Sequence, residues 1–475
     1  MIGLKHLTPS MAALLLMTVN VSMVSAQTND LEQKVKTYFQ QKLKVKEQTV
    51  KDSKEAFIKE SLPSSDMEKV IKGKDLASCQ SIVWKAWCEA NEETQEEKLI
   101  PMKDLKEGNH EKWNLPTSLE PNAVMPYYYG MKGESKSKLP FFIYLHGSGP
   151  KDQEWSTGLK LANIFQDSPS VYFIPQIPNE GEYYRWWQLA KQYAWEKLLR
   201  ITLSDDKIDA NRLYIFGISE GGYGSQRLAS FYADYFAAAG PMAGGEPLKN
   251  APVENCANIG FSFLTGAVDQ GFYRNILTYY TQVAFDSIQL AHPISADGKP
   301  MFQHRINLLP NMQHSIDYRL TPPWLKSFTR NPYPKTVLWE DFDMDGRHRT
   351  GFYNLQVLAR PSEERTYYEM NIKDNVISLS IDDVKYTATQ KDPQWGIEMK
   401  FNRTYSKATG GKLRIYLNAN LVDMNKTVTV IVNGKQVFNG KVKANLRDMI
   451  DSCMEFYDPY RVYPCSVTVE YKLNL

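Results

Sequence analysis

The pattern of hydrophobic and polar positions divides the chain into three parts. Near the N-terminus, five apolar residues recur at helical spacing and would cover one face of a helix: Leu31, Val35, Tyr38, Phe39 and Leu43. Similar patterns surround three later stretches: Phe57–Ile58, Met67–Ile71 and Ile82–Trp87. Residues 27–119 are therefore predicted to form a helical extension that packs on the remainder of the chain.

The second part carries short apolar runs that predict strands: Phe141–Leu145, Val171–Ile174, Leu213–Phe216, Phe236–Ala239, Phe261–Leu264 and Arg305–Leu309. Helical stretches such as Leu189–Leu199 and Tyr223–Tyr232 lie between them. This alternation indicates an α/β domain over residues 120–334, with a mostly parallel sheet and helices on both faces. Its active site is expected at the carboxyl ends of the strands.

The third part, residues 335–475, has alternating or β-branched runs without a long helix between them: Val376–Ile381, Lys412–Leu417 and Thr427–Val432. The pair Asn433-Gly434 between two such runs is a strong signal for a type I′ hairpin. We predict a small antiparallel, sandwich-like β domain. The segment Pro332-Tyr333-Pro334 disfavours helix and is predicted to be the stiff linker before it.

Residues 1–26 have the pattern of a signal peptide. One charge, Lys5, precedes an apolar run from Met11 to Val24, and small residues precede the expected cut after Ala26. The run of 14 residues is shorter than the roughly 20 that a membrane-spanning helix needs. This favours export to the periplasm or the extracellular space over the alternative, a retained membrane anchor.

Composition narrows the classes of function. The 475 residues include 56 basic and 54 acidic side chains, a net charge of +2, which argues against a nucleic-acid partner held by a basic field. The five cysteines offer two short-range pairs, Cys79/Cys88 and Cys453/Cys465, and leave Cys256 over, although sequence does not fix the pairing. No Cys/His cluster has metal-site spacing, so we expect neither metal nor cofactor.

The segment Leu213–Gly222 carries the central chemical motif, a strand followed by Gly-Ile-Ser-Glu-Gly and the start of a helix. A serine hydroxyl is a poor nucleophile unless a base takes its proton during attack. A sharp strand-to-helix turn with flanking glycines lifts such a serine out of the sheet. Ser219 is therefore the candidate nucleophile.

The acid and the base should follow the nucleophile in that order. Asp269 comes just after the strand Phe261–Leu264, and His314 lies in the loop after Arg305–Leu309. Weaker candidates remain for each role: Asp286 for the acid, and His292, His304 and His348 for the base. The first two of these histidines precede the carboxyl end of their strand, and His348 belongs to the β domain.

A tetrahedral intermediate needs donors for its oxyanion. One should be the backbone N–H of Glu220, directly after the nucleophile. The other should come from the loop His146-Gly147-Ser148-Gly149 after an earlier strand, with the N–H of Ser148 favoured over that of Gly149. His146 itself could be a second catalytic histidine, but a structural role in the loop is favoured because it precedes the nucleophile.

Together these features resemble the α/β-hydrolase superfamily, in particular secreted serine esterases and the catalytic domains of prolyl oligopeptidases. The resemblance covers residues 120–330, under half of the chain, and rests on the loop at His146, the Ser219 motif and the loops at Asp269 and His314. It implies that Ser219 is the nucleophile, His314 the base and then the acid, and Asp269 its orienting partner. The propeller of true prolyl oligopeptidases has no room here.

Two further motifs concern ligands. Arg185, Trp186 and Trp187 follow a strand and are predicted to bind substrate at the rim, by stacking on a sugar or an aromatic acyl group, although core packing is the alternative. The stretch Asp341–Gly346 resembles the opening of a calcium loop, but its twelfth position is Phe352 rather than Glu, which favours a solvated acidic turn.

The sequence thus predicts an exported serine hydrolase acting on a small-molecule or glycan-linked carboxylic ester. The first alternative is a peptidase that uses the same triad on an amide. The second is a glycan-binding protein whose hydrolase domain is inactive, which the complete set Ser219, Asp269 and His314 speaks against.

Overall fold

The computed structural model describes residues 29–43, 70–94 and 98–472. The predicted signal peptide, the stretch Phe57–Ile58 and residues 67–69 lie outside these residues. Val70, in the stretch Met67–Ile71 that is predicted to be helical, forms an isolated bridge with Asn445 instead. Among the described residues, no helix is long and apolar enough to cross a membrane.

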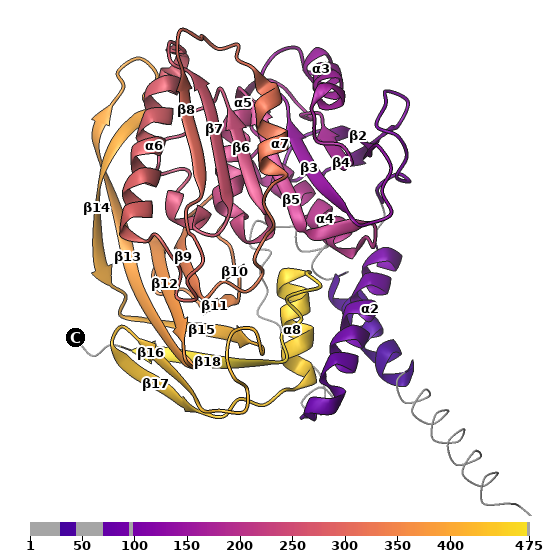
Figure 1. Ribbon diagram of the computed structural model, residues 1–475, viewed down its shortest axis with the longest axis vertical. Coiled ribbons are helices and arrows are strands. Elements are labelled where there is room, and N and C mark those ends of the chain that lie inside the picture. Colours follow the sequence, from indigo (N-terminus) through magenta and orange to yellow (C-terminus); the bar gives the residue numbers. More distant parts are fainter. Residues whose placement is uncertain (1–28, 44–69, 95–97, 473–475) are drawn as a thin grey trace, which may run out of the picture.

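The N-terminal extension contains a helix over residues 29–43 and a second one, α2 (Leu76–Thr94). The predicted apolar face of the first helix is buried except at Leu31, which is partly buried, and Phe39 packs edge-to-face on Trp87 of α2, with ring centroids 5.3 Å apart. Figure 1 shows α2 beside α8 (Leu446–Phe456) of the C-terminal part. The extension therefore packs on the rest of the chain, as the periodicity predicts.

An eight-stranded sheet forms the middle of the molecule, in the order β1-β2-β4-β3-β5-β6-β7-β8 (Figure 1). Its strands are β1 (His110–Asn114), β2 (Val124–Lys132), β3 (Leu139–Leu145), β4 (Ser170–Pro175), β5 (Ile208–Ile218), β6 (Ala238–Met242), β7 (Gly260–Gly266) and β8 (His304–Leu309). The six strands β4, β3, β5, β6, β7 and β8 run parallel to one another. At one edge of the sheet, β2 pairs antiparallel with β4, and β1 pairs antiparallel with β2. This is the α/β-hydrolase fold that the sequence predicts.

Helices cover both faces of the sheet because the central strands are apolar on both sides. On β5, Leu213 and Ile215 belong to the core beneath α4 (Leu189–Ser204), α5 (Glu220–Phe231) and α6 (Arg274–Ala291). Tyr214 and Phe216 point to the other core, beneath α3 (Lys151–Ile164) and α7 (Thr321–Leu325). The predicted two-faced burial is confirmed.

The sheet begins earlier than the boundary predicted at residue 120, because β1 pairs with β2 as its edge strand. The pattern could not reveal this strand, since only Trp113 of its five residues is buried. An edge strand with one inward side chain carries no continuous apolar run.

The C-terminal part holds two sheets. The larger contains β9 (Thr336–Asp341), β12 (Arg365–Lys373), β13 (Val376–Lys391), β14 (Glu398–Lys407), β16 (Val428–Val432) and β17 (Lys435–Gly440). The smaller contains β10 (Gly351–Phe352), β11 (Leu355–Ala359), β15 (Gly410–Leu417) and β18 (Cys465–Lys472). Trp339 of the first sheet stacks on Phe352 of the second at 5.3 Å, so the two sheets share a core, as in a sandwich.

Asn433 and Gly434 have φ angles of 48° and 81° between β16 and β17, which agrees with the predicted hairpin. Two features differ from the expectation. The pair β13·β16 is parallel, because the chain makes a long excursion through β14 and β15 before it returns. The sequence also does not predict helix α8, which lies after the last β-branched run that the pattern identifies.

A cluster of buried ions joins the α/β domain to the C-terminal domain. Asp234 accepts from Arg349 at 2.9 Å and from Arg461 at 2.6 Å, and Asp458 accepts from Arg330 at 2.6 Å. All five side chains are nearly or fully buried. Burial by itself would raise the pKa of the Asp234 and Asp458 carboxyls, but the neighbouring guanidinium groups hold both below their ordinary values.

The suggested cysteine pairs are not formed: Cys88, Cys453 and Cys465 carry free thiols, as does Cys256. Cys79 and Cys88 both lie on α2, nine residues apart. At 1.5 Å per residue they are separated by about 13 Å along the helix axis, too far for a disulfide.

The acidic turn after β9 is only partly solvated. Asp341 is buried and pairs with Arg360 and, at 3.1 Å, with His348. Asp345 is exposed, but its carboxylate accepts from the Leu189 N–H at 2.7 Å at the start of α4. Asp341 and Asp345 therefore have partners within the protein, which the interpretation as a solvated acidic turn does not predict.

Candidate active site

Ser219 lies at a sharp turn between β5 and α5. Its backbone angles, φ 56° and ψ −115°, are strained for a residue with a side chain. The neighbouring glycines leave no space for a side chain. A Cβ on Gly217 would lie 2.2 Å from the Gly221 carbonyl oxygen, and a Cβ on Gly221 would lie 2.0 Å from the Leu145 carbonyl oxygen. The Ser219 N–H donates to the Met242 carbonyl at 3.0 Å. The turn is thus held between the ends of β3 and β6.

The structure brings the three predicted triad residues together. His314, in the loop after β8, places Nε2 3.0 Å from Ser219 Oγ. Its Nδ1 lies 2.7 Å from Oδ2 of Asp269, in the loop after β7. Because a carboxylate can only accept, Nδ1 carries the proton and Nε2 is free to accept from the serine hydroxyl. This arrangement can activate Ser219 as a nucleophile.

Arg274, which the sequence does not predict as a site residue, fixes the orientation of Asp269. Its Nε donates to both oxygens of the buried carboxylate, at 3.0 and 2.9 Å, and Nη2 lies 2.8 Å from Oδ1. Burial alone would lower the pKa of this guanidinium, but its hydrogen bond with Asp269 raises it overall. Nothing in the local pattern distinguishes this arginine, since only the folded loop turns it back on the carboxylate.

The loop His146–Gly149 after β3 lies directly against the nucleophile, because a Cβ on Gly147 would be 3.2 Å from Ser219 Cβ. His146 is fully buried and supports this loop. Its Nε2 accepts from the Ile177 N–H at 3.1 Å, and its Nδ1 lies 2.8 Å from the Gly147 oxygen. Burial lowers the pKa of His146 to about 4, so the ring is neutral at physiological pH.

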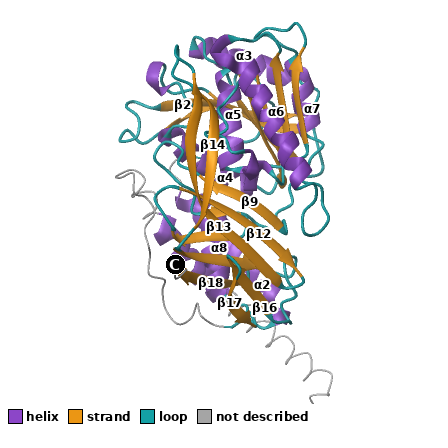
Figure 2. Cartoon of the chain, turned by 90° about the vertical axis from the view of Figure 1, so that its left-hand side faces the viewer, coloured by secondary structure: helices purple, strands orange, loops and turns teal. Residues whose placement is uncertain are grey.

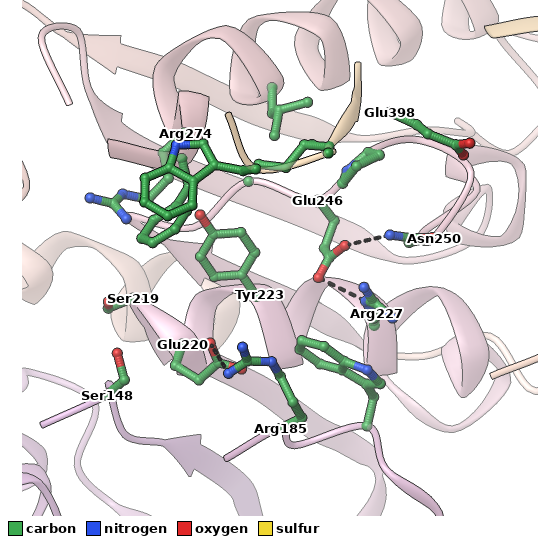
Figure 3. A pocket seen from close by; sticks show the side chains of 18 of the residues that line it. Ser148, Arg185, Ser219, Glu220, Tyr223, Arg227, Glu246, Asn250, Arg274 and Glu398 are labelled. Carbon is green, nitrogen blue, oxygen red and sulfur yellow. Dashed lines mark hydrogen bonds and ion pairs between the residues drawn. The ribbon is translucent and has the colours of Figure 1, made fainter. Parts of the chain in front are cut away.

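Ser148 and Glu220, the two predicted oxyanion donors, line the same cavity as Ser219 (Figure 3). The Glu220 carboxyl is mostly buried and lies 3.4 Å from Arg185. Burial raises its pKa to about 7, against the opposing effect of Arg185. The negative charge of this side chain is therefore reduced at neutral pH.

The three predicted rim residues divide into two groups. Arg185 and Trp187 line the cavity, and the guanidinium carbon of Arg227 lies 3.8 Å from the Trp187 ring centroid. Trp186 does not line it, and the prediction that it binds substrate is wrong. Its ring is fully buried and its Nε1 donates to the His146 carbonyl at 3.1 Å. Both tryptophans lie in the turn before α4, whose backbone sends the Trp186 ring into the core and leaves Trp187 at the cavity.

This division predicts different effects for the two tryptophans. Trp187→Ala should raise KM for a ring-bearing ester severalfold with little change in melting temperature. Trp186→Ala should instead lower the free energy of unfolding by about 3–5 kcal/mol, as for other buried aromatics. Thermal melts and steady-state kinetics of both variants check this. Equal destabilisation by the two substitutions, with KM unchanged, would show that Trp187 is also a core residue.

The rival candidates lie elsewhere. His304 pairs with Asp286 at 3.0 Å, between β8 and α6, and His348 pairs with Asp341 in the C-terminal domain. His292 ends α6. The structure thus joins Ser219 to His314 and gives His304 and His348 other carboxylate partners.

The cavity beside Ser219 has a volume of about 490 Å³. One wall comes from the α/β domain and includes Tyr223, Arg227 and Glu246 (Figure 3). The opposite wall comes from the β13–β14 hairpin, with Trp395 in its loop and Glu398 at the start of β14. The sequence does not predict this contribution of the C-terminal domain, and its one local signal is a tryptophan in a Pro/Gly-containing turn.

Comparisons with known proteins find no matching family model and no match among curated proteins. Solved structures do match part of the chain. A thermostable esterase is 19% identical over 47% of this chain and 64% of its own, with a TM-score of 0.34. This chain therefore spans less than two thirds of that esterase.

Two other solved structures belong to named esterases. A ferulic acid esterase from Anaeromyces mucronatus is 12% identical over 49% of this chain and 95% of its own, with a TM-score of 0.35. An acetyl xylan esterase from Aspergillus awamori is 12% identical over 44% of this chain and 94% of its own, with a TM-score of 0.32.

Proposed function

We propose that this chain is an exported serine hydrolase that cleaves carboxylic esters through an acyl-enzyme. One observation carries the proposal: Ser219, His314 and Asp269 form a continuous hydrogen-bonded chain whose serine opens into a cavity. Three loops at the carboxyl ends of β5, β7 and β8 supply these residues. The arrangement needs no further group to carry out acyl transfer.

In the first half of the reaction, Ser219 Oγ attacks the ester carbonyl while its proton passes to His314 Nε2. The resulting imidazolium keeps its Nδ1–H on Asp269, which stabilises the new charge. The carbonyl oxygen becomes an oxyanion, for which the backbone N–H groups of Ser148 and Glu220 are the proposed donors. The bond to the alkoxy oxygen then breaks, and the alcohol leaves with the proton from His314.

In the second half, water replaces the alcohol. His314 Nε2 takes a proton from the water as its oxygen attacks the acyl carbon on Ser219. The second oxyanion uses the same two donors, and its collapse returns the proton to Ser219 Oγ and releases the carboxylic acid. The same groups thus act as base and acid in alternation.

The triad could also cleave an amide, so a substrate panel tests the choice. Acyl esters and Pro-containing peptides of matched size should be compared by kcat/KM, with rapid mixing to detect a burst of the first product. We expect turnover and a burst on esters. Faster turnover of the peptides would make the protein a peptidase, and absence of turnover on both would favour an inactive glycan-binding homologue.

A further inference from the structure

The loop joining β13 to β14, Asp392–Ile397, is named here the hairpin tip. Figure 2 shows the two strands rising from the C-terminal domain along the hydrolase domain. Two ion pairs connect β14 to the hydrolase domain: Lys249 Nζ lies 3.1 Å from Glu398, and Arg403 lies 2.6 Å from Glu254. These pairs hold the β13–β14 hairpin against the α/β core.

Hydrogen bonds within the hairpin tip close its backbone into a turn. The Asp392 N–H donates to the Ile397 carbonyl at 2.8 Å, and the Gly396 N–H donates to the Asp392 carbonyl at 3.1 Å. The Asp392 side chain also accepts from the Trp395 N–H and holds the turn closed. Gly396 has a φ of 69°, a conformation that favours glycine. Trp395 is thereby presented from a fixed backbone while its side chain remains half exposed.

The tip is fastened to the loop that carries Asp269. Tyr273 donates its hydroxyl to Asp392 at 2.6 Å, and the Phe272 ring lies 4.7 Å from the Trp395 ring. Phe272 and Tyr273 have φ angles of 50° and 60°, which is unusual for two consecutive residues with large side chains. Such strain persists where surrounding contacts fix it, and it clusters at functional sites. Here it aims both rings at the hairpin tip.

The chemistry of the cavity indicates what the tip faces. The lining contains four basic and three acidic side chains, the amide of Asn250 and five aromatic rings: Trp187, Tyr223, Phe272, Trp395 and Phe401. A hydrocarbon ring would remove water from these polar groups without replacing their hydrogen bonds. A sugar ring offers hydroxyl groups at its edge and an apolar C–H face for an indole ring. The mixed lining therefore fits a sugar better than an aromatic hydrocarbon.

We propose that the hairpin tip is a specificity-determining wall that binds the sugar ring of an acylated glycan, with Trp395 as its stacking platform. This inference rests on the proposed ester hydrolase function. It gives the C-terminal domain a direct part in the site, because the fastening at Tyr273 and Asp392 sets the distance between the sugar subsite and the triad. The carbonyl carbon of the ester on the bound sugar would then face Ser219 Oγ.

The test compares a sugar ester with a small ester in the full-length protein. The measured quantity is the ratio of kcat/KM for mono-acetylated methyl pyranosides to that for ethyl acetate. Trp395→Ala should lower this ratio by about five- to tenfold, the size expected for loss of one ring contact. Tyr273→Phe, which removes only the hydroxyl that holds Asp392, should lower it by a smaller factor.

Tyr405→Ala is the matched control, because Tyr405 lies on β14, is similarly half exposed and does not line the cavity. It should leave the ratio unchanged. An unchanged ratio in Trp395→Ala would overturn the assignment.

A binding measurement separates this outcome from failure of the proposed function. If the wild-type protein hydrolyses neither ester, the proposed function fails, and calorimetry with the same acetylated pyranosides decides the inference alone. A Kd raised about five- to tenfold by Trp395→Ala would still support the sugar subsite. Equal Kd values in the two proteins, or no binding to either, would overturn it.

Discussion

Ser219→Ala is expected to lower kcat by about 10⁴- to 10⁶-fold while the protein stays folded, because the variant lacks the atom that would form the acyl-enzyme. The change removes one hydroxyl whose only hydrogen bond among the described contacts of the site is to His314. The melting temperature should therefore hardly change. Kinetics on the best ester, together with a thermal melt, check both expectations.

His314→Ala should cause a loss of similar size, and the double variant should be little worse than either single one, because residues that act as a unit are not additive. His304→Ala is the matched control, since His304 also pairs with a carboxylate, that of Asp286 near the C-terminal end of α6. It should keep its activity. If His304→Ala lost activity and His314→Ala kept it, the assignment of the base would be wrong.

The second large effect concerns stability. Asp234→Asn should lower the free energy of unfolding by about 3–5 kcal/mol, because it leaves Arg349 and Arg461 buried beside a neutral amide. Chemical denaturation measures the loss. Asp317→Asn, which breaks an exposed pair with Arg319, is the control and should have little effect.

The same cluster predicts how stability depends on pH. The pKa of the Asp234 and Asp458 carboxyls is lower in the folded protein than its ordinary value of about 3.9. Their contribution is therefore fully present above that value and is lost as the pH falls through their folded pKa. The wild-type protein should lose stability steeply below about pH 4. Asp234→Asn should show a shallower loss there, and an equally steep loss would mean that other groups control it.

The sequence predicts those parts of the molecule whose position in the fold is already indicated by the residue pattern of a short segment. The strands of the parallel sheet are apolar on both faces, and the turn at Ser219 leaves no alternative to glycine at Gly217 and Gly221. Because the acid and the base are expected to follow the nucleophile at the ends of later strands, the sequence then indicates Asp269 and His314. Each of these inferences depends on backbone constraints that short segments display.

The missed features depend on contacts between distant segments. Strand β1 has a single buried side chain, and the inward turn of Trp186 is decided by the packing of His146 and Gly224 around it. Arg274 and the hairpin tip reach the site only because loops fold back and because two domains meet. Hydrophobic periodicity within a segment carries no information about such an approach.

One measurement tests the central claim most directly: labelling of the wild-type protein with a fluorophosphonate, followed by mass spectrometry of its peptides. Such a reagent phosphonylates a serine that a neighbouring base has activated. We predict one adduct per chain, on Ser219, which is absent from Ser219→Ala and retained in Ser135→Ala, a change in an exposed loop. An adduct on another residue, or no adduct on the folded protein, would contradict the proposal that Ser219 is the nucleophile of a hydrolase.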